Sequence, residues 1–490
     1  MSNLSWRTAS LALFGTLVVY LISFLGSRNT LAEIIWLSAI LIITAFGRWR
    51  SLIFVTSLVV VELVAGSLGR LFAFPSGLSL REGLFAIALL ATLLRLWRNP
   101  DELAYLRQHI LKWPFLFLAA VIIWGILRGL TLHPFRLVIA DANAYGYFLL
   151  LPAFLLAYRE EKNRELLFST ILGATTAAAL LTLFELYIFT HGWNEPFLGA
   201  QYKWVRDFGL GEITRAPGGF YRVFFQAHFW NFIVFIWSPA LIVSHLGNIR
   251  ANDSKVWWLF VPAALSAAAL FVSFSRTFWL AAGLAALLGL AIVIARSDLR
   301  GAAFRYLGAL IFISILGVAV PFAITRSVGG AAFSRAGALA GEAAADSRMN
   351  LLAVMAPVIR EHPILGWGFG KELTYITKDP RLLAYFPDGR YTTYAFEWGW
   401  LDFWLKMGLG GMIAFLALVL TLLRGLWRGI AVADDRWLSL ALFLSLVGVS
   451  VAHLFSPWLN HPLGIGLVLL IVALWQKTKS DPYIKKDSYF

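Results

Sequence analysis

The chain contains no cysteine and few charged residues. The absence of cysteine among 490 residues excludes disulfide bonds, a thiolate nucleophile and any metal site built on thiolates. Charged residues make up only 14% of the chain, whereas an ordinary soluble domain contains about 25%. So few charges exclude an ordinary soluble globular protein.

Long apolar runs take up most of the sequence. Hydrophobic residues make up 60% of the chain, against about 45–50% in soluble domains. We therefore predict an all-α polytopic membrane protein of about fourteen transmembrane helices. The predicted spans are residues 9–27, 30–47, 51–69, 79–97, 113–127, 137–157, 166–190, 223–245, 256–274, 277–295, 305–325, 400–423, 437–455 and 462–476. Twelve spans is the alternative, if the pair at 79–97 and 113–127 lies partly in the membrane interface.

The basic residues are divided unevenly between alternate loops, which predicts the orientation of the chain in the membrane. Alternate loops carry clusters of arginine and lysine, while the short loops between them carry isolated arginines such as Arg28, Arg70 and Arg276. Basic clusters favour the cytoplasmic side. Both termini are therefore predicted to lie inside, and the net charge of +14 requires no nucleic-acid partner.

The longest polar interruption divides the chain into three predicted parts. Residues 1–325 are expected to form a transmembrane bundle. Residues 326–400 form a large extracytoplasmic loop domain with short helices, and residues 401–490 form the C-terminal transmembrane helices and a cytoplasmic tail.

This polar stretch contains an ordered series of motifs. Arg348 stands near the start of a predicted helix whose apolar face includes Leu351 and Met355. Next comes His362-Pro363-Ile364-Leu365-Gly366-Trp367-Gly368-Phe369-Gly370, which follows no strand and opens no helix, so it is interpreted as a tight turn and not a nucleotide site. The stretch ends as Glu397 and Trp398 lead into a span containing Lys406-Met407-Gly408-Leu409-Gly410-Gly411.

This order of motifs resembles the O-antigen ligase and polymerase superfamily of bacterial membrane glycosyltransferases. The family pattern is an arginine on a short helix, then His-Pro-x-x-Gly-x-Gly-x-Gly, then His-Asn-x-x-Leu-(x)6-Gly-Leu-x-Gly at the start of a span. Arg348, residues 362–370, Leu401 and Gly408 fall in register. The chain departs from the pattern at one place, where Glu397 and Trp398 hold the histidine and asparagine positions. The resemblance implies a C-type glycosyltransferase architecture and an inverting reaction in which a polyprenyl diphosphate leaves.

Four arginines in the predicted outer loops are candidates for binding that diphosphate: Arg215, Arg222, Arg276 and Arg348. Arginine forks bind phosphate oxygens bidentately and keep their charge. Gly218 and Gly219, between the first two, would allow backbone amides to approach a ligand closely. The alternative is that these arginines are snorkelling or solvated loop charges.

Glu397 is the candidate catalytic base. The resemblance implies that a residue at this position activates the acceptor, and an ionised carboxylate can accept the hydroxyl proton. The alternative is that Glu397 only pairs with one of the arginines, in which case Asp402 is the next candidate base. His362 is interpreted as a capping or turn residue before Pro363. No HExxH, Walker or Asp-x-Asp pattern stands in the outer loops, so we expect metal-independent chemistry without a cofactor.

The predicted function is transfer of a glycan from a polyprenyl diphosphate to an acceptor hydroxyl on the outer face of the bacterial cytoplasmic membrane. The expected partners are the lipid-linked donor, a lipid or glycan acceptor and the bilayer. One alternative is a polymerase that joins lipid-linked repeat units. Another is a transporter or flippase of an anionic lipid, although such a protein should show broken helices in two matched halves.

Glu62 and Glu185 each lie inside an apolar run of a predicted span. A carboxylate in hydrocarbon is costly, so Glu62 and Glu185 are each expected to face the bundle interior with a partner. They are interpreted either as packing residues or as part of a proton path or acceptor contact.

The orientation is testable because the chain has no native cysteine. Single cysteines introduced at Ser254 and Thr392 should lie on opposite sides of the membrane. In intact cells an impermeant thiol reagent should label the variant at position 392 and spare the one at position 254. Labelling of the second variant alone would contradict the predicted orientation.

Overall fold

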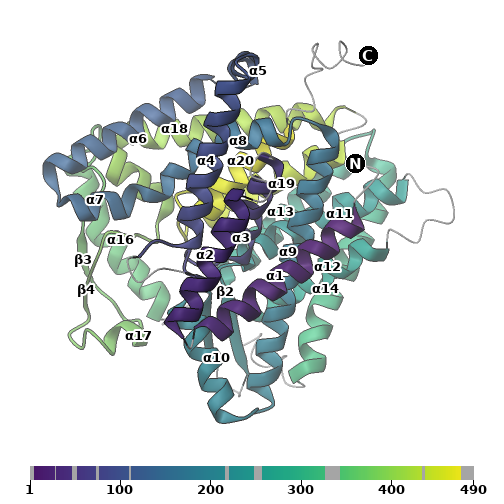
Figure 1. The fold of residues 1–490 in the computed structure, drawn as a ribbon, viewed down its shortest axis with the longest axis horizontal. Coiled ribbons are helices and arrows are strands. Elements are labelled where there is room, and N and C mark those ends of the chain that lie inside the picture. The colour runs from purple at the N-terminus through teal and green to yellow at the C-terminus, as the bar shows by residue number, and fades with distance from the viewer. Residues whose placement is uncertain are drawn as a thin grey trace.

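The computed structural model describes residues 5–27, 29–46, 52–72, 77–109, 112–215, 220–247, 257–325, 343–432 and 436–475. Within these ranges the fold is a bundle of helices with two short β-hairpins (Figure 1). The helices are α1 (Trp6–Gly26), α2 (Thr30–Phe46), α3 (Leu52–Ala65), α4 (Leu80–Arg98), α5 (Asp101–His109), α6 (Lys112–Leu132), α7 (Phe135–Ala142), the 3-10 helix η1 (Asn143–Leu150), α8 (Leu151–Ala157), α9 (Glu161–Thr190), α10 (Glu195–Asp207), α11 (His228–Gly247), α12 (Trp257–Ser273), α13 (Arg276–Ala295), the 3-10 helix η3 (Arg300–Ala302), α14 (Ala303–Thr325), α16 (Ala343–Glu361), α17 (Pro380–Leu383), α18 (Gly399–Ile430), α19 (Arg436–Ala452) and α20 (Pro462–Trp475).

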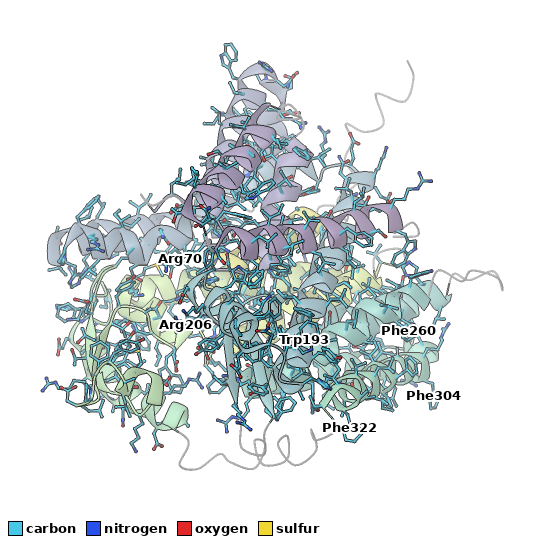
Figure 2. The ribbon with its side chains drawn as sticks, turned by 60° about the horizontal axis from the view of Figure 1, so that its bottom comes forward. Arg70, Trp193, Arg206, Phe260, Phe304 and Phe322 are labelled. Carbon is cyan, nitrogen blue, oxygen red and sulfur yellow. The ribbon has the colours of Figure 1, made fainter. Side chains whose placement is uncertain are left out.

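Each predicted span overlaps a helix, with η1 continuing α7 into α8. The span predicted at 223–245 is wrong at its start, because Tyr221–Phe225 forms a strand and the helix begins only at His228. Among the described residues, eight helices are long and apolar enough to cross a membrane, and five shorter helices are also apolar. The multi-pass membrane architecture is therefore confirmed, while the count of fourteen and the three-part division stay predictions. Large apolar side chains cover much of the outside, as Phe304 and Phe322 of α14 do at the edge of the structure (Figure 2). A bilayer would cover such a surface.

Helix α9 occupies the centre of the bundle because its middle consists of small residues. A run from Gly173 to Ala179 is buried, and a Cβ atom on Gly173 would lie 2.0 Å from the carbonyl oxygen of Ala9. Helix α1 can therefore pack directly against the backbone of α9. Small residues allow such close approach between membrane helices.

The two hairpins are β1 (Gly211–Arg215) with β2 (Tyr221–Phe225), and β3 (Leu373–Ile376) with β4 (Arg390–Thr393). Helices α10 and α17 lie at the same end of the structure, opposite α5 (Figure 1). We call the end that carries these hairpins and helices the loop face. Gly218 and Gly219, which the sequence singled out, lie outside the described residues, as does the segment 326–342.

Helix α18 is broken at Gly408, and the glycine-punctuated turn fills the break. Gly408 has φ 70° and ψ −167°, so the helix cannot satisfy its own backbone groups there. The N–H groups of Trp367 and Gly368 instead donate to the carbonyls of Leu405 (2.8 Å) and Lys406 (2.9 Å). In return, the N–H of Leu409 donates to the carbonyl of Pro363 at 2.9 Å.

Glycines make this interlock possible. Gly366, Gly368 and Gly370 all have positive φ values, of 69°, 81° and 84°, which confirms the predicted tight turn. A Cβ atom on Gly366 would lie 2.4 Å from the backbone nitrogen of Gly408. Only a residue without a side chain can bring the turn this close to the broken helix.

A cluster of charged groups is buried beside the turn. Lys406 of α18 lies 2.6 Å from a carboxylate oxygen of Asp141 and 2.6 Å from one of Asp402. The remaining oxygens are also bonded, because Gly370 N–H donates to Asp141 (2.8 Å) and Asn460 donates to Asp402 (2.6 Å). The cluster thus ties α7, α18, the turn and the loop before α20 together.

Glu62 and Glu185 differ in their surroundings. Glu62 is buried and paired with Arg81 at 2.9 Å, which confirms the expected partner. Glu185 is fully buried, but neither carboxylate oxygen has a hydrogen-bond partner among the described residues. The sequence could not show this difference, because Arg81 comes from another helix.

The interlock predicts a specific sensitivity to alanine. Gly366→Ala should destabilise the protein, because a left-handed conformation costs a non-glycine residue about 1–2 kcal/mol and the new methyl group would clash with Gly408. The midpoint temperature of unfolding in lipid nanodiscs should fall. Gly308→Ala in α14 is the matched control, since nothing lies within 4 Å of its added Cβ; equal behaviour of the two variants would contradict the interlock.

Candidate functional site

A cavity of about 410 Å³ opens on the loop face. Segments far apart in the sequence line it: the first hairpin, the turn between α12 and α13, the start of α16, β3, α17 and the loops that precede α18 and α20. The residues are Leu68, Glu212, Arg222, Phe224, Gln226, Phe274, Ser275, Arg276, Thr277, Ser347, Arg348, Tyr375, Thr377, Asp379, Leu382, Glu397, Ser456, Pro457, Trp458 and His461. Four of the five predicted site residues are therefore brought together.

Arg222 enters the cavity from strand β2. Its Nε donates to the carbonyl oxygen of Ser273 at 2.9 Å, and its Nη1 lies 3.6 Å from Glu212. The guanidinium also packs over the ring of Phe224, at 5.2 Å from the ring centre. These contacts hold the guanidinium of Arg222 beside the end of α12, so its side chain has a defined position in the cavity wall.

Arg276 is placed by a strained turn. Phe274 adopts φ 50°, a conformation that is costly for a bulky residue. Its buried ring packs against Phe220 at 4.8 Å and Trp279 at 5.5 Å. Arg276 then becomes the first residue of α13. The helix dipole disfavours a cation at a helix N-terminus and attracts an anion there. An anionic ligand bound at the start of α13 would therefore be attracted by both the helix end and Arg276.

Arg348 and Glu397 form an ion pair inside the cavity. Nε of Arg348 lies 2.5 Å from Oε2 of Glu397. The indole of Trp398 fixes the helix below this pair by donating to the backbone carbonyl of Arg348 at 2.9 Å. The Glu397 side chain remains about half exposed, at 49%, so its other oxygen can meet a ligand.

Arg215 lies apart from the cavity residues. It ends strand β1, opposite Tyr221, and its side chain is exposed. Side chains alternate across a strand. Glu212 and Arg222 share one face of the hairpin, with Thr214 opposite Arg222, so Arg215 falls on the other face.

Asp402, the second candidate base, is buried one turn inside α18. It is paired with Lys406 and Asn460 and does not line the cavity. This arrangement assigns it to the buried charge cluster. His362, interpreted as a turn residue, precedes the docked turn and packs edge-on against Trp367 at 4.4 Å.

The cavity also contains polar residues that sequence reasoning missed. Tyr375 of β3 is one of them, and burial, together with the nearby charge of Glu397, raises the pKa of its hydroxyl to about 12. The others include Glu212, Asp379 and His461. No motif marks them, since each reaches the cavity through the pairing of a hairpin or the packing of a loop.

Comparison with known protein families gives a match over part of the chain. Residues 261–416 match the family model for O-antigen ligase. The match confirms the resemblance to the O-antigen ligase and polymerase superfamily, and it supports a glycosyltransferase-like function of that kind. It includes Arg276, Arg348, the docked turn and Glu397, whereas Arg222 and His461 lie outside it. The comparison with curated proteins found no match.

The cavity geometry ranks the arginines. Lysine in place of Arg222, Arg276 or Arg348 should lower transfer activity by at least tenfold, because a point charge cannot reproduce a bidentate fork. Arg215→Lys should have little effect, since this side chain does not line the cavity. Arg206→Lys serves as a further control, because Arg206 is exposed, pairs with its neighbour Asp207 and does not line the cavity (Figure 2). A loss in Arg215→Lys as large as in Arg276→Lys would contradict this ranking.

Proposed function

We propose that the protein transfers a glycan from a polyprenyl diphosphate to an acceptor hydroxyl on the outer face of the bacterial cytoplasmic membrane. The observation that carries this proposal is the cavity that joins Arg222, Arg276 and Arg348 with Glu397. It opens where α13 begins and α12 ends, so a lipid tail could run along apolar helices while its diphosphate meets the arginines.

The arginines would stabilise the departing group. When the bond between the sugar's anomeric carbon and the diphosphate oxygen breaks, negative charge grows on the diphosphate. Fixed cations and helix ends lower the energy of that charge without rearrangement. At an effective dielectric constant of about 20, one charge pair at 4 Å is worth roughly 4 kcal/mol before desolvation. Arg222 and Arg276 are assigned this role.

Glu397 would act on the acceptor. Its carboxylate takes the proton of the acceptor hydroxyl as the hydroxyl oxygen forms the new bond to the anomeric carbon. Displacement from the side opposite the diphosphate inverts the configuration of that carbon. The ion pair with Arg348 orients the carboxylate, and the exposed half of the side chain leaves room for the acceptor.

A direct assay tests this function. The purified full-length protein, in detergent or nanodiscs, is incubated with a labelled lipid-linked glycan and candidate acceptors, without any ion gradient. Release of polyprenyl diphosphate with transfer of the label supports the proposal. Transfer onto a second lipid-linked glycan would identify a polymerase. Movement of intact donor across a vesicle membrane, without release of diphosphate, would identify a transporter and contradict the proposal.

Substitution of Glu397 separates catalysis from charge pairing. Glu397→Gln keeps the shape of the side chain but cannot accept the proton, so turnover should fall by about 10²–10⁴ while donor binding persists. Glu397→His restores the residue type of the family pattern and should keep part of the activity. Asp379→Asn, at another carboxylate of the cavity wall, is the matched control. Near-full turnover of Glu397→Gln would show that Glu397 serves only as a partner of Arg348.

A further inference from the structure

A histidine outside the matched segment lines the same cavity. His461 ends the loop between α19 and α20, and its backbone carbonyl accepts the first hydrogen bond of α20, from Ile465 N–H at 3.0 Å. Its side-chain Nδ1 accepts from the N–H of Leu463 at 3.3 Å. His461 therefore caps the N-terminus of α20 with its ring, in the manner of a capping side chain.

This cap determines which ring nitrogen carries the proton. In a neutral imidazole one nitrogen donates and the other accepts. Because Nδ1 accepts from Leu463, the proton lies on Nε2, and no described residue accepts a hydrogen bond from it. Burial and the nearby guanidinium of Arg81 lower the pKa of His461 to about 3, so the ring stays neutral at physiological pH.

The loop that carries His461 is fixed against the start of α13. Trp458 stacks on Phe278 of α13 with 5.2 Å between ring centres, and it packs on Phe229 of α11 at 5.1 Å. The N–H of His461 donates to the carbonyl of Trp458 at 3.0 Å. The N-terminus of α20 and the N-terminus of α13, with Arg276, thus border one cavity.

We propose that His461 donates its Nε2–H to a phosphate oxygen of the lipid-linked diphosphate, as a neutral positioning residue of the donor site. This inference rests on the proposed function and extends it, because it places the diphosphate between two helix N-termini. Both helix ends attract an anion. The neutral imidazole of His461 adds a hydrogen bond to the diphosphate at this point without adding a further charge.

The same geometry assigns the base to another residue. To accept a proton, Nε2 would have to lose its own, which would shift the remaining proton to Nδ1. The cap on Leu463 would then be lost, because Nδ1 would face that N–H as a second donor. Glu397, with an exposed carboxylate oxygen, has no such conflict.

Two substitutions separate the proposed hydrogen bond from Nε2–H to the ligand from the helix cap formed by Nδ1. His461→Asn keeps a cap acceptor, since asparagine is among the best N-cap residues, but its amide is too short to replace Nε2–H. His461→Gln brings an amide N–H close to the position of Nε2 but removes the cap acceptor. The glutamine variant should therefore unfold at a lower temperature than wild type, and the asparagine variant should bind the ligand more weakly.

Binding of farnesyl diphosphate, a short prenyl diphosphate without sugar, to the full-length protein in nanodiscs is the decisive measurement. His461→Asn should bind about ten- to a hundredfold more weakly than wild type, as expected for one lost hydrogen bond to a charged group. His461→Gln should bind within about threefold of wild type. Wild-type affinity in the asparagine variant would overturn the inference and leave His461 a structural cap.

The remaining outcomes are also informative. If both variants bound farnesyl diphosphate equally weakly and unfolded at the wild-type temperature, the inference would be overturned. The hydrogen bond from Nε2–H would then make no difference to binding. Failure of the wild-type protein itself to bind farnesyl diphosphate would instead overturn the proposed function, and with it this extension. Failure of the inference about His461, in which wild type binds farnesyl diphosphate and the asparagine variant binds it equally well, is thereby distinguished from failure of the proposed function, in which wild type does not bind it.

Discussion

The docking of the turn at 363–369 into the break of α18 is the contact on which the cavity depends. The broken helix leaves the carbonyls of Leu405 and Lys406 without helical partners, and the turn supplies N–H donors to both. Arg348 lies on the helix before the turn, and Glu397 lies in the loop just before the broken helix. The interlock therefore holds together the two parts of the chain that carry Arg348 and Glu397. It also connects them to the membrane bundle.

The buried cluster around Lys406 strengthens this connection. A buried cation facing two carboxylates is stable only when the remaining oxygens are also satisfied, and here Asn460 and the Gly370 N–H complete the set. The cluster touches the turn and the loop before α20, which bears His461. The loop that forms one wall of the cavity is thus tied, through the buried charge of Lys406, to the docked turn.

Much of the architecture follows from the sequence because it is encoded locally. Apolar runs predict helices, and three glycines in alternate positions predict a turn with positive φ. The composition of the cavity is not encoded in this way. Arg215 and Arg222 read alike in the sequence, yet the register of the hairpin, with Thr214 opposite Arg222, sends them to opposite faces. His461 and Tyr375 belong to the cavity through loop packing and strand pairing, for which the sequence carries no periodic signal.

The charges in the cavity suggest an order of events. Three arginines face three carboxylates, Glu212, Asp379 and Glu397, so the cavity walls are nearly neutral before a ligand enters. Arg222 lies 3.6 Å from Glu212, a looser pair than Arg348 with Glu397 at 2.5 Å. An entering diphosphate would more easily displace the carboxylate from Arg222 than from Arg348. The donor would then be held near Arg222, Arg276 and the two helix ends, while Arg348 continues to shield Glu397 from its charge. Under the proposed function, the carboxylate would then stay oriented toward the acceptor during the step in which it accepts a proton.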